Sequence, residues 1–106
     1  MITIPTPFFL KTVKALQKKY PSIMADLAAL RLSLLKDPQQ GESLGKGCYK
    51  VRFAISSKKT GKRNDSRIIT CVKIENDTIH LLAAFEKSER ATIKGKALDN
   101  LLKQID

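Results

Sequence analysis

Apolar and polar residues recur with a helical period in the first third of the chain. Residues 6–20 and 22–36 place apolar side chains three and four positions apart, as a helix with one buried stripe does. Thr6 and Pro7 are typical of a helix start, and Pro21 separates the two helices by a short joint. We therefore predict an antiparallel helical hairpin. Its apolar stripes are Phe9, Val13, Leu16 and Tyr20, followed by Ile23, Leu27, Leu30 and Leu34.

The rest of the chain shows strand patterns. Residues 1–4 are short and β-branched, which predicts a strand. Residues 49–74 contain two alternating runs around a polar tip, the pattern of a β-hairpin with a long loop. Residues 78–85 are almost all apolar, which indicates a central strand buried on both faces. Before the hairpin, residues 37–48 (DPQQGESLGKGC) are typical of a loop.

A helical pattern returns from about Thr92 and continues to Ile105. The predicted order of elements is β-α-α-β-β-β-α, within one domain that covers residues 1–106. This is an α+β fold: a small antiparallel-rich sheet with an N-terminal helical hairpin on one face and a C-terminal helix. The other face of the sheet is then left to carry Lys50 and Arg52.

Positive charge is concentrated in the predicted hairpin. Residues 45–74 hold nine Lys or Arg and one acid, so they carry +8 of the net charge of +10. Lys50 and Arg52 alternate with apolar neighbours, so both point to one face of the strand, and Arg67 opens the return strand. Solubility alone does not require cations inside strands. The pattern indicates a surface that binds RNA, DNA or an acidic partner.

The remaining composition excludes several classes of protein. A hydrophobic fraction of 42% is too high for a disordered basic tail. No apolar run approaches the ~20 residues of a membrane span, and no signal-peptide core is evident, so we expect a cytoplasmic protein with no membrane contact. Cys48 and Cys71 form no metal-binding motif, so no metal is expected. They could approach each other across the hairpin, although reduced thiols are the default in the cytoplasm.

Three segments cover nearly the whole chain in order: IPTPFFLKTVKALQKKYPSIMADL, GKGCYKVRFAISSKKTGKRNDSRIITCV and IHLLAAFEKSERATI. Together they resemble the RelE/ParE superfamily of bacterial toxins from type II toxin–antitoxin systems, closest to its RelE/HigB branch. The resemblance implies a cofactor-free and metal-independent endoribonuclease that cleaves mRNA in the ribosomal A site. It also implies three kinds of partner: a cognate antitoxin, the ribosome with its mRNA, and operator DNA only through the antitoxin complex.

The resemblance also implies site residues. Those matching the family's catalytic positions are Lys50, Arg52, Lys62, Arg67 and Lys87. The other cations expected to bind RNA are Lys46, Lys58, Lys59, Arg63 and Lys73.

The chain departs from the family pattern at two places. Asn64 and Asp65 stand where close members carry two glycines, and Phe85 stands where many carry a tyrosine that could exchange a proton. These departures concern the catalytic residues and not the fold that the resemblance implies.

Clustered cations offer one route to RNA cleavage. Arg52 and Arg67 can hold phosphate oxygens, and a lysine crowded by cations, Lys50 or Lys62, is a candidate general base. His80, the only histidine, lies in an apolar strand and is better explained as structural.

Plainer readings of the same residues stay open. Lys50 and Arg52 could bind phosphate without catalysis, and Lys62 and Arg63 could be ordinary loop charges. Arg67 could pair with an acid on the next strand or just beyond it, the candidates being Glu86 and Glu89. For the whole protein, the alternatives are a gyrase poison of the ParE type and a degenerate member that binds RNA or antitoxin without cleaving.

Overall fold

The computed structural model describes residues 1–58, 66–86 and 95–105. The predicted order of elements is confirmed, with one short strand added inside the segment that the sequence indicated as a loop. The elements are β1 (Ile2–Pro5), α1 (Pro7–Lys19), α2 (Ile23–Lys36), the added strand β2 (Glu42–Gly45), β3 (Cys48–Phe53), β4 (Ser66–Lys73), a 3₁₀ turn (Ile74–Asn76), β5 (Thr78–Glu86) and α3 (Lys96–Leu102).

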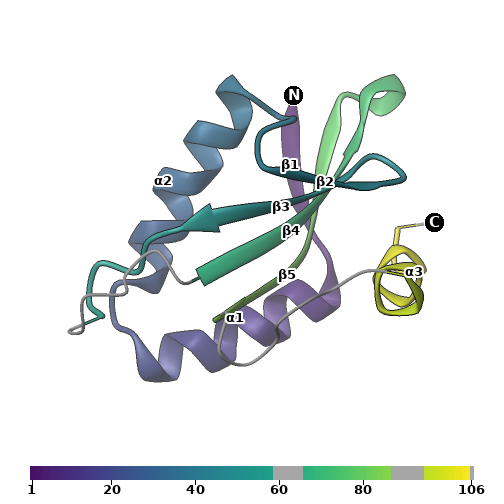
Figure 1. The fold of residues 1–106 in the computed structure, drawn as a ribbon. Helices are drawn as coiled ribbons and strands as arrows, with labels where there is room; N and C mark the ends of the chain where they lie inside the picture. The colour runs from purple at the N-terminus through teal and green to yellow at the C-terminus, as the bar shows by residue number, and fades with distance from the viewer. Residues whose placement is uncertain (59–65, 87–94, 106) are drawn as a thin grey trace.

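The five strands drawn in Figure 1 form one sheet in the order β1-β5-β4-β3-β2. β1 pairs with β5 in parallel and all other pairs are antiparallel, so the sheet is antiparallel-rich as predicted. β5 lies between two strands and nearly all its residues are buried, which confirms the prediction of a central strand. Leu82 is an extra residue in β5: Ile69 pairs with Ala83 but Thr70 pairs with Leu81, which makes a β-bulge.

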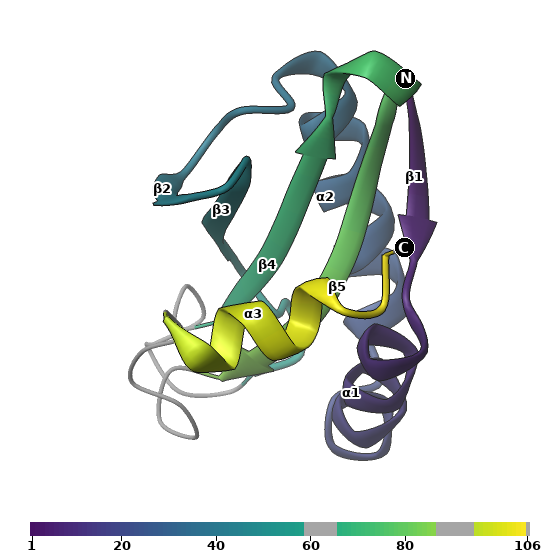
Figure 2. The same cartoon turned by 90° about the vertical axis from the view of Figure 1, so that its right-hand side faces the viewer.

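Helices cover both faces of the sheet. Figure 2 shows α3 crossing in front of β4 and β5, with α2 behind the sheet and α1 at the lower right. The buried residues of α1 and α2 belong to one cluster and those of α3 to another, so α1 and α2 share the face opposite α3. The core accordingly has two clusters: one beneath α1 and α2, containing Val51, Phe53 and Ile79, and one beneath α3, containing Ile69 and Phe85. The face expected to carry only the hairpin's cations is thus partly covered by α3.

The helical hairpin lies on one face, as predicted, but its geometry differs from the expectation. From the joint at Tyr20–Ser22 the two helices diverge and form a corner, instead of lying side by side along their lengths (Figure 1). The apolar stripe of each helix packs against the sheet, as the buried residues Leu16 and Leu34 show in the cluster that also holds strand residues. Contact with the sheet therefore determines where each helix lies.

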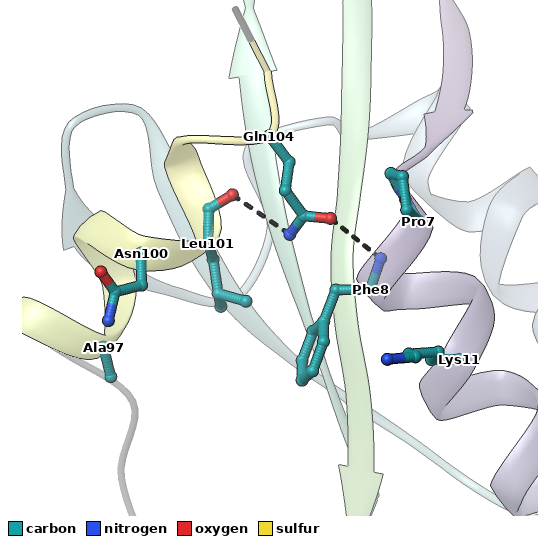
Figure 3. Close-up of a pocket in the computed structure, with 7 residues that line it drawn as sticks. All are labelled: Pro7, Phe8, Lys11, Ala97, Asn100, Leu101 and Gln104. Carbon is teal, nitrogen blue, oxygen red and sulfur yellow. Dashed lines mark hydrogen bonds between the residues drawn. The ribbon is translucent and has the colours of Figure 1, made fainter.

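Gln104, just after the C-terminal helix α3, is hydrogen-bonded to the start of α1. The Phe8 amide donates a hydrogen bond of 2.9 Å to Oε1 of Gln104, shown in Figure 3. Beside this bond a cleft of about 630 Å³ separates the two helices, with apolar side chains such as Phe8 and Leu101 in its wall. No helix in the described part of the chain is long and apolar enough to cross a membrane.

Thr6 joins the start of α1 to the central strand. Its Oγ1 accepts a hydrogen bond from the Phe9 amide at 3.3 Å, which caps the helix as the sequence predicts, and donates one to the Leu81 carbonyl at 3.0 Å. The side chain is buried, so neither bond is easily replaced by water.

We expect Thr6→Ala to lower the free energy of unfolding by about 1–2 kcal/mol, because it removes the cap and leaves a buried carbonyl with one partner fewer. Urea denaturation followed by circular dichroism measures the loss. Thr6→Ser keeps the hydroxyl and is the matched control. Equal losses in the two variants would mean that the methyl group, not the hydroxyl, provides the stability.

Candidate nucleic-acid interface

Cations from two neighbouring strands share one face of the sheet. In the β3–β4 ladder Arg52 is directly opposite Arg67, and in the β4–β5 ladder Arg67 is opposite Phe85, so the three residues form a row across the sheet. Phe85 belongs to the cluster beneath α3, which identifies the face. Lys50 is two residues before Arg52 and therefore lies on the same face. The structure thus brings Lys50, Arg52 and Arg67 together.

These three cations differ in their surroundings. Arg52 is exposed, whereas Arg67 has a relative exposure of 8% and its Nη1 donates a hydrogen bond of 3.1 Å to the Ser66 carbonyl. The Lys50 Nζ lies 3.5 Å from a carboxylate oxygen of Glu42, an exposed residue on the added strand β2. Arginine stays charged at any working pH, so two like charges face each other across β3 and β4.

The other described cations lie apart from this row. The Lys46 ammonium forms an ion pair with Asp99 of α3. Lys73 is on the same face but six residues from Arg67, about 20 Å along an extended strand. Lys58 is bound to the buried Glu86, with 3.2 Å between its Nζ and a carboxylate oxygen. Each stays a predicted RNA-binding residue, but none adjoins the pair of arginines.

The remaining predicted site residues lie outside the described residues. They are Lys62 and Lys87, predicted to be catalytic, and Lys59 and Arg63, predicted to bind RNA. Also outside them are Asn64 and Asp65, which depart from the family pattern, and Glu89, a possible partner of Arg67.

The sequence named Glu86 only as a possible partner of Arg67, whereas its carboxylate is buried on the opposite face of the sheet. Glu86 ends β5 with a relative exposure of 2%, and its carboxylate accepts hydrogen bonds from the Lys19 ammonium at 2.9 Å and from the Tyr20 hydroxyl. Together with the Lys58 ion pair, these bonds join the end of β5 to the end of α1 and to the segment after β3. Because neighbouring residues of a strand point to opposite faces, this carboxylate lies on the other side of the sheet from Arg67. A glutamate directly after an apolar strand was the available signal.

The pKa values of Tyr20 and Lys19, two of the residues that bind Glu86, are raised. The hydrogen bond to Glu86 is the largest cause that raises the pKa of Tyr20 above 10.0, and it likewise raises the pKa of Lys19 above 10.5. Both side chains are thereby held in the protonated state that binds the carboxylate.

A second polar network attaches the beginning of the basic loop to α2. The Asp26 carboxylate accepts hydrogen bonds from the Ser56 amide at 2.9 Å, the Ser56 hydroxyl at 2.6 Å and the Ser22 hydroxyl at 2.7 Å. Partial burial acts to raise the pKa of Asp26, but the hydrogen bonds from Ser56 and Ser22 outweigh it and the pKa is lowered. The carboxylate therefore stays ionised and holds the loop at neutral pH.

Among the residues that the structure describes, the single histidine and the acids give no further site. His80 lies on β5, opposite Cys71, and its Nε2 is 3.5 Å from the Thr78 hydroxyl. Burial first, and the Lys73 charge second, lower its pKa, so the ring is neutral at pH 7, consistent with a structural role. No three His, Cys, Asp or Glu side chains within residues 1–58, 66–86 and 95–105 are arranged to hold a metal ion.

Comparison with known proteins identifies the class of fold. No family model and no curated protein matches the sequence. Among solved structures, the chain is similar to the free state of a mutant of the E. coli toxin RelE in which two arginines are replaced by alanine. The TM-score is 0.63 at 13% identity, over 99% of this chain and 97% of that one. This likeness confirms the predicted RelE-like fold, while the assignment to the HigB branch stays a prediction.

Proposed function

We propose that this protein is the toxin of a type II toxin–antitoxin system and that it cleaves mRNA on the ribosome. The observation that carries the proposal is the pair Arg52–Arg67, two like charges set opposite each other on a sheet with the fold of the toxin RelE. Two guanidinium groups side by side on one face can hold the oxygens of a single phosphate diester through charge-assisted hydrogen bonds.

RNA cleavage of this class needs three things from the protein. A base takes the proton of the ribose 2′-hydroxyl, cations stabilise the charge that develops on the phosphate, and an acid protonates the leaving 5′-oxygen. Arg52 and Arg67 supply the second, with about 3 kcal/mol of transition-state stabilisation from each well-placed donor. Among the residues that the structure describes, Lys50 is the candidate for the base. Lys62 and Lys87 stay candidates from sequence, and positioning of the message by the ribosome would lower the remaining barrier.

The proposed partners follow from the charge. A cognate antitoxin with acidic segments would cover the basic face and silence the toxin, and operator DNA would be reached only through that complex. Such a toxin acts in the cytoplasm, where the ribosome and message are found.

Mapping transcript ends by primer extension after brief induction tests the proposal. We expect new 5′ ends at codon boundaries within translated regions, and none when translation is blocked. Intact messages together with a DNA-damage response would instead indicate a gyrase poison of the ParE type. Intact messages without that response would indicate a member that only binds, as the lack of a hydroxyl at Phe85 would favour.

A point variant links the activity to the basic face. We expect Arg52→Ala to reduce cleavage by about 10²-fold, because it removes one donor to the phosphate. Arg52 is exposed, so the fold should be unaffected. The matched control is Arg31→Ala, an exposed arginine of α2 that bonds Thr3 on the opposite face. Equal cleavage by the two variants would place the active site elsewhere.

A further inference from the structure

Two buried thiols face each other in the basic hairpin. Cys48 of β3 and Cys71 of β4 are register partners, both are free, and each is completely buried. Both belong to the cluster that α3 covers. The candidate site described above uses neither of them.

Their position in the ladder is the one that brings side chains closest. The Val72 amide donates a hydrogen bond of 2.9 Å to the Gly47 carbonyl, which marks the adjacent pair as hydrogen-bonded. Pairs alternate along an antiparallel ladder, so Cys48 and Cys71 form a non-hydrogen-bonded pair, with Cα atoms typically about 4.5 Å apart. This spacing lies within the range of about 4.4–6.8 Å found across disulfides. Both sulfur atoms also lie near one carbonyl oxygen, that of Lys46, at 3.8 and 3.9 Å.

The surroundings of the two thiols shift their pKa values in opposite directions. The hydrogen bond from Cys48 is the largest cause that lowers the pKa of Cys71 to about 7, and the Lys73 ammonium lowers it further. The same contact, followed by burial, raises the pKa of Cys48. Near neutral pH a fraction of Cys71 is therefore thiolate beside the protonated Cys48, and the thiolate is the form that attacks an oxidant.

We propose that Cys48 and Cys71 are a redox modification site, at which hydrogen peroxide forms a reversible disulfide between β3 and β4. Hydrogen peroxide is the oxidant of choice because the pair is completely buried, which favours a small reagent over a bulky disulfide. This site is independent of the proposed ribonuclease activity.

The reaction balances in two steps. The Cys71 thiolate attacks one peroxide oxygen, a sulfur–oxygen bond forms as the oxygen–oxygen bond breaks, and the released hydroxide takes up the proton lost by Cys71 to give water. Cys48 then attacks the sulfur of Cys71, the disulfide forms as the sulfur–oxygen bond breaks, and the departing hydroxide takes the Cys48 proton to give a second water. Two thiols are oxidised and one peroxide is reduced. An external dithiol reverses the change by exchange once the chain is unfolded in denaturant and the bond is exposed.

The disulfide would close a loop that contains the whole basic tip. Twenty-two residues separate the two cysteines, so the bond restricts the unfolded chain. It would also fix the pairing of the strands that carry Arg52 and Arg67, since Cys48 and Cys71 are each four residues from the arginine of their own strand.

The test treats the reduced full-length protein with hydrogen peroxide, then alkylates it in denaturant and measures its intact mass. We expect the loss of two hydrogen atoms, no alkylation, a peptide linking Cys48 to Cys71, and recovery of both thiols with a dithiol. The thermal midpoint should rise by about 5–15 °C. Two thiols that remain alkylatable, separate oxygen adducts, or disulfide-linked dimers would each overturn the proposal.

Single variants provide the control. Cys48→Ser and Cys71→Ser each leave one thiol, so peroxide should neither raise the thermal midpoint nor remove two hydrogens from a monomer. The mass measurement on the unmodified sequence decides the proposal even if a variant folds poorly.

Discussion

Replacing Arg67 with alanine is expected to reduce cleavage of translated message by about 10²–10³-fold, the loss typical for one donor to a developing negative charge. Arg67 occupies the centre of the row formed with Arg52 and Phe85, and its low exposure places it in a less polar environment than Arg52. An ionic interaction is stronger where water is partly excluded, so the loss should exceed that of Arg52→Ala. Cleavage of a defined message on purified ribosomes measures both variants.

Arg67→Lys separates charge from geometry. Lysine keeps the charge but cannot bind two phosphate oxygens through a planar fork, so we expect an intermediate activity. The unfolding transition of each variant is recorded in parallel, with activity assayed well below its midpoint. Full activity in a folded Arg67→Ala protein would remove this residue from the site.

Glu86→Ala is expected to lower the free energy of unfolding by about 3–5 kcal/mol. The carboxylate is buried on the side of α1, where Lys19, Tyr20 and Lys58 all bind it. Its removal leaves a partly buried ammonium group and a hydroxyl without their acceptor, and the loss of one partner from a buried ion pair is among the costliest substitutions. Urea denaturation at pH 7 measures the effect. Glu75→Ala, at an exposed position, is the matched control and should change stability by less than about 0.5 kcal/mol.

The pH dependence gives this cluster a second signature. The folded-state pKa values of Tyr20 and Lys19 are raised, so the stability that they contribute is complete below their unfolded values of 10.0 and 10.5 and is lost as the pH rises further. The native protein should therefore lose stability above about pH 10 more steeply than Glu86→Gln. Parallel stability curves for the two proteins would contradict the assigned contacts.

Local patterns in the sequence were sufficient for much of the fold. Spacings of three and four residues identify both N-terminal helices, and alternation in β3 places Lys50 and Arg52 on one face. The strand β2 was missed because ESLG has no β-branched residue and is ordered as an edge strand by pairing with β3. Divergence of the helices from their joint depends on the sheet surface, which no local pattern describes.

The candidate site could be predicted only in part. That Arg52 and Arg67 share a face follows from alternation and a hairpin, but their direct opposition depends on a register that a long loop does not determine. The partners of Glu86 come from segments 28 to 67 residues away, so only the folded chain reveals them. Sequence distance likewise concealed that Lys58 neutralises this acid.

The extra residue Leu82 determines which charges become neighbours. Without this irregularity, the residues of β5 after Leu82 would each point to the opposite face of the sheet. Phe85 would then point toward α1, and Glu86 would point toward the arginines. A carboxylate there would cancel part of the field that attracts a polyanion. One extra residue in β5 therefore separates acid from base across the thickness of the sheet. A deletion or insertion near Leu82 would alter the electrostatics of the molecule without changing any charged residue.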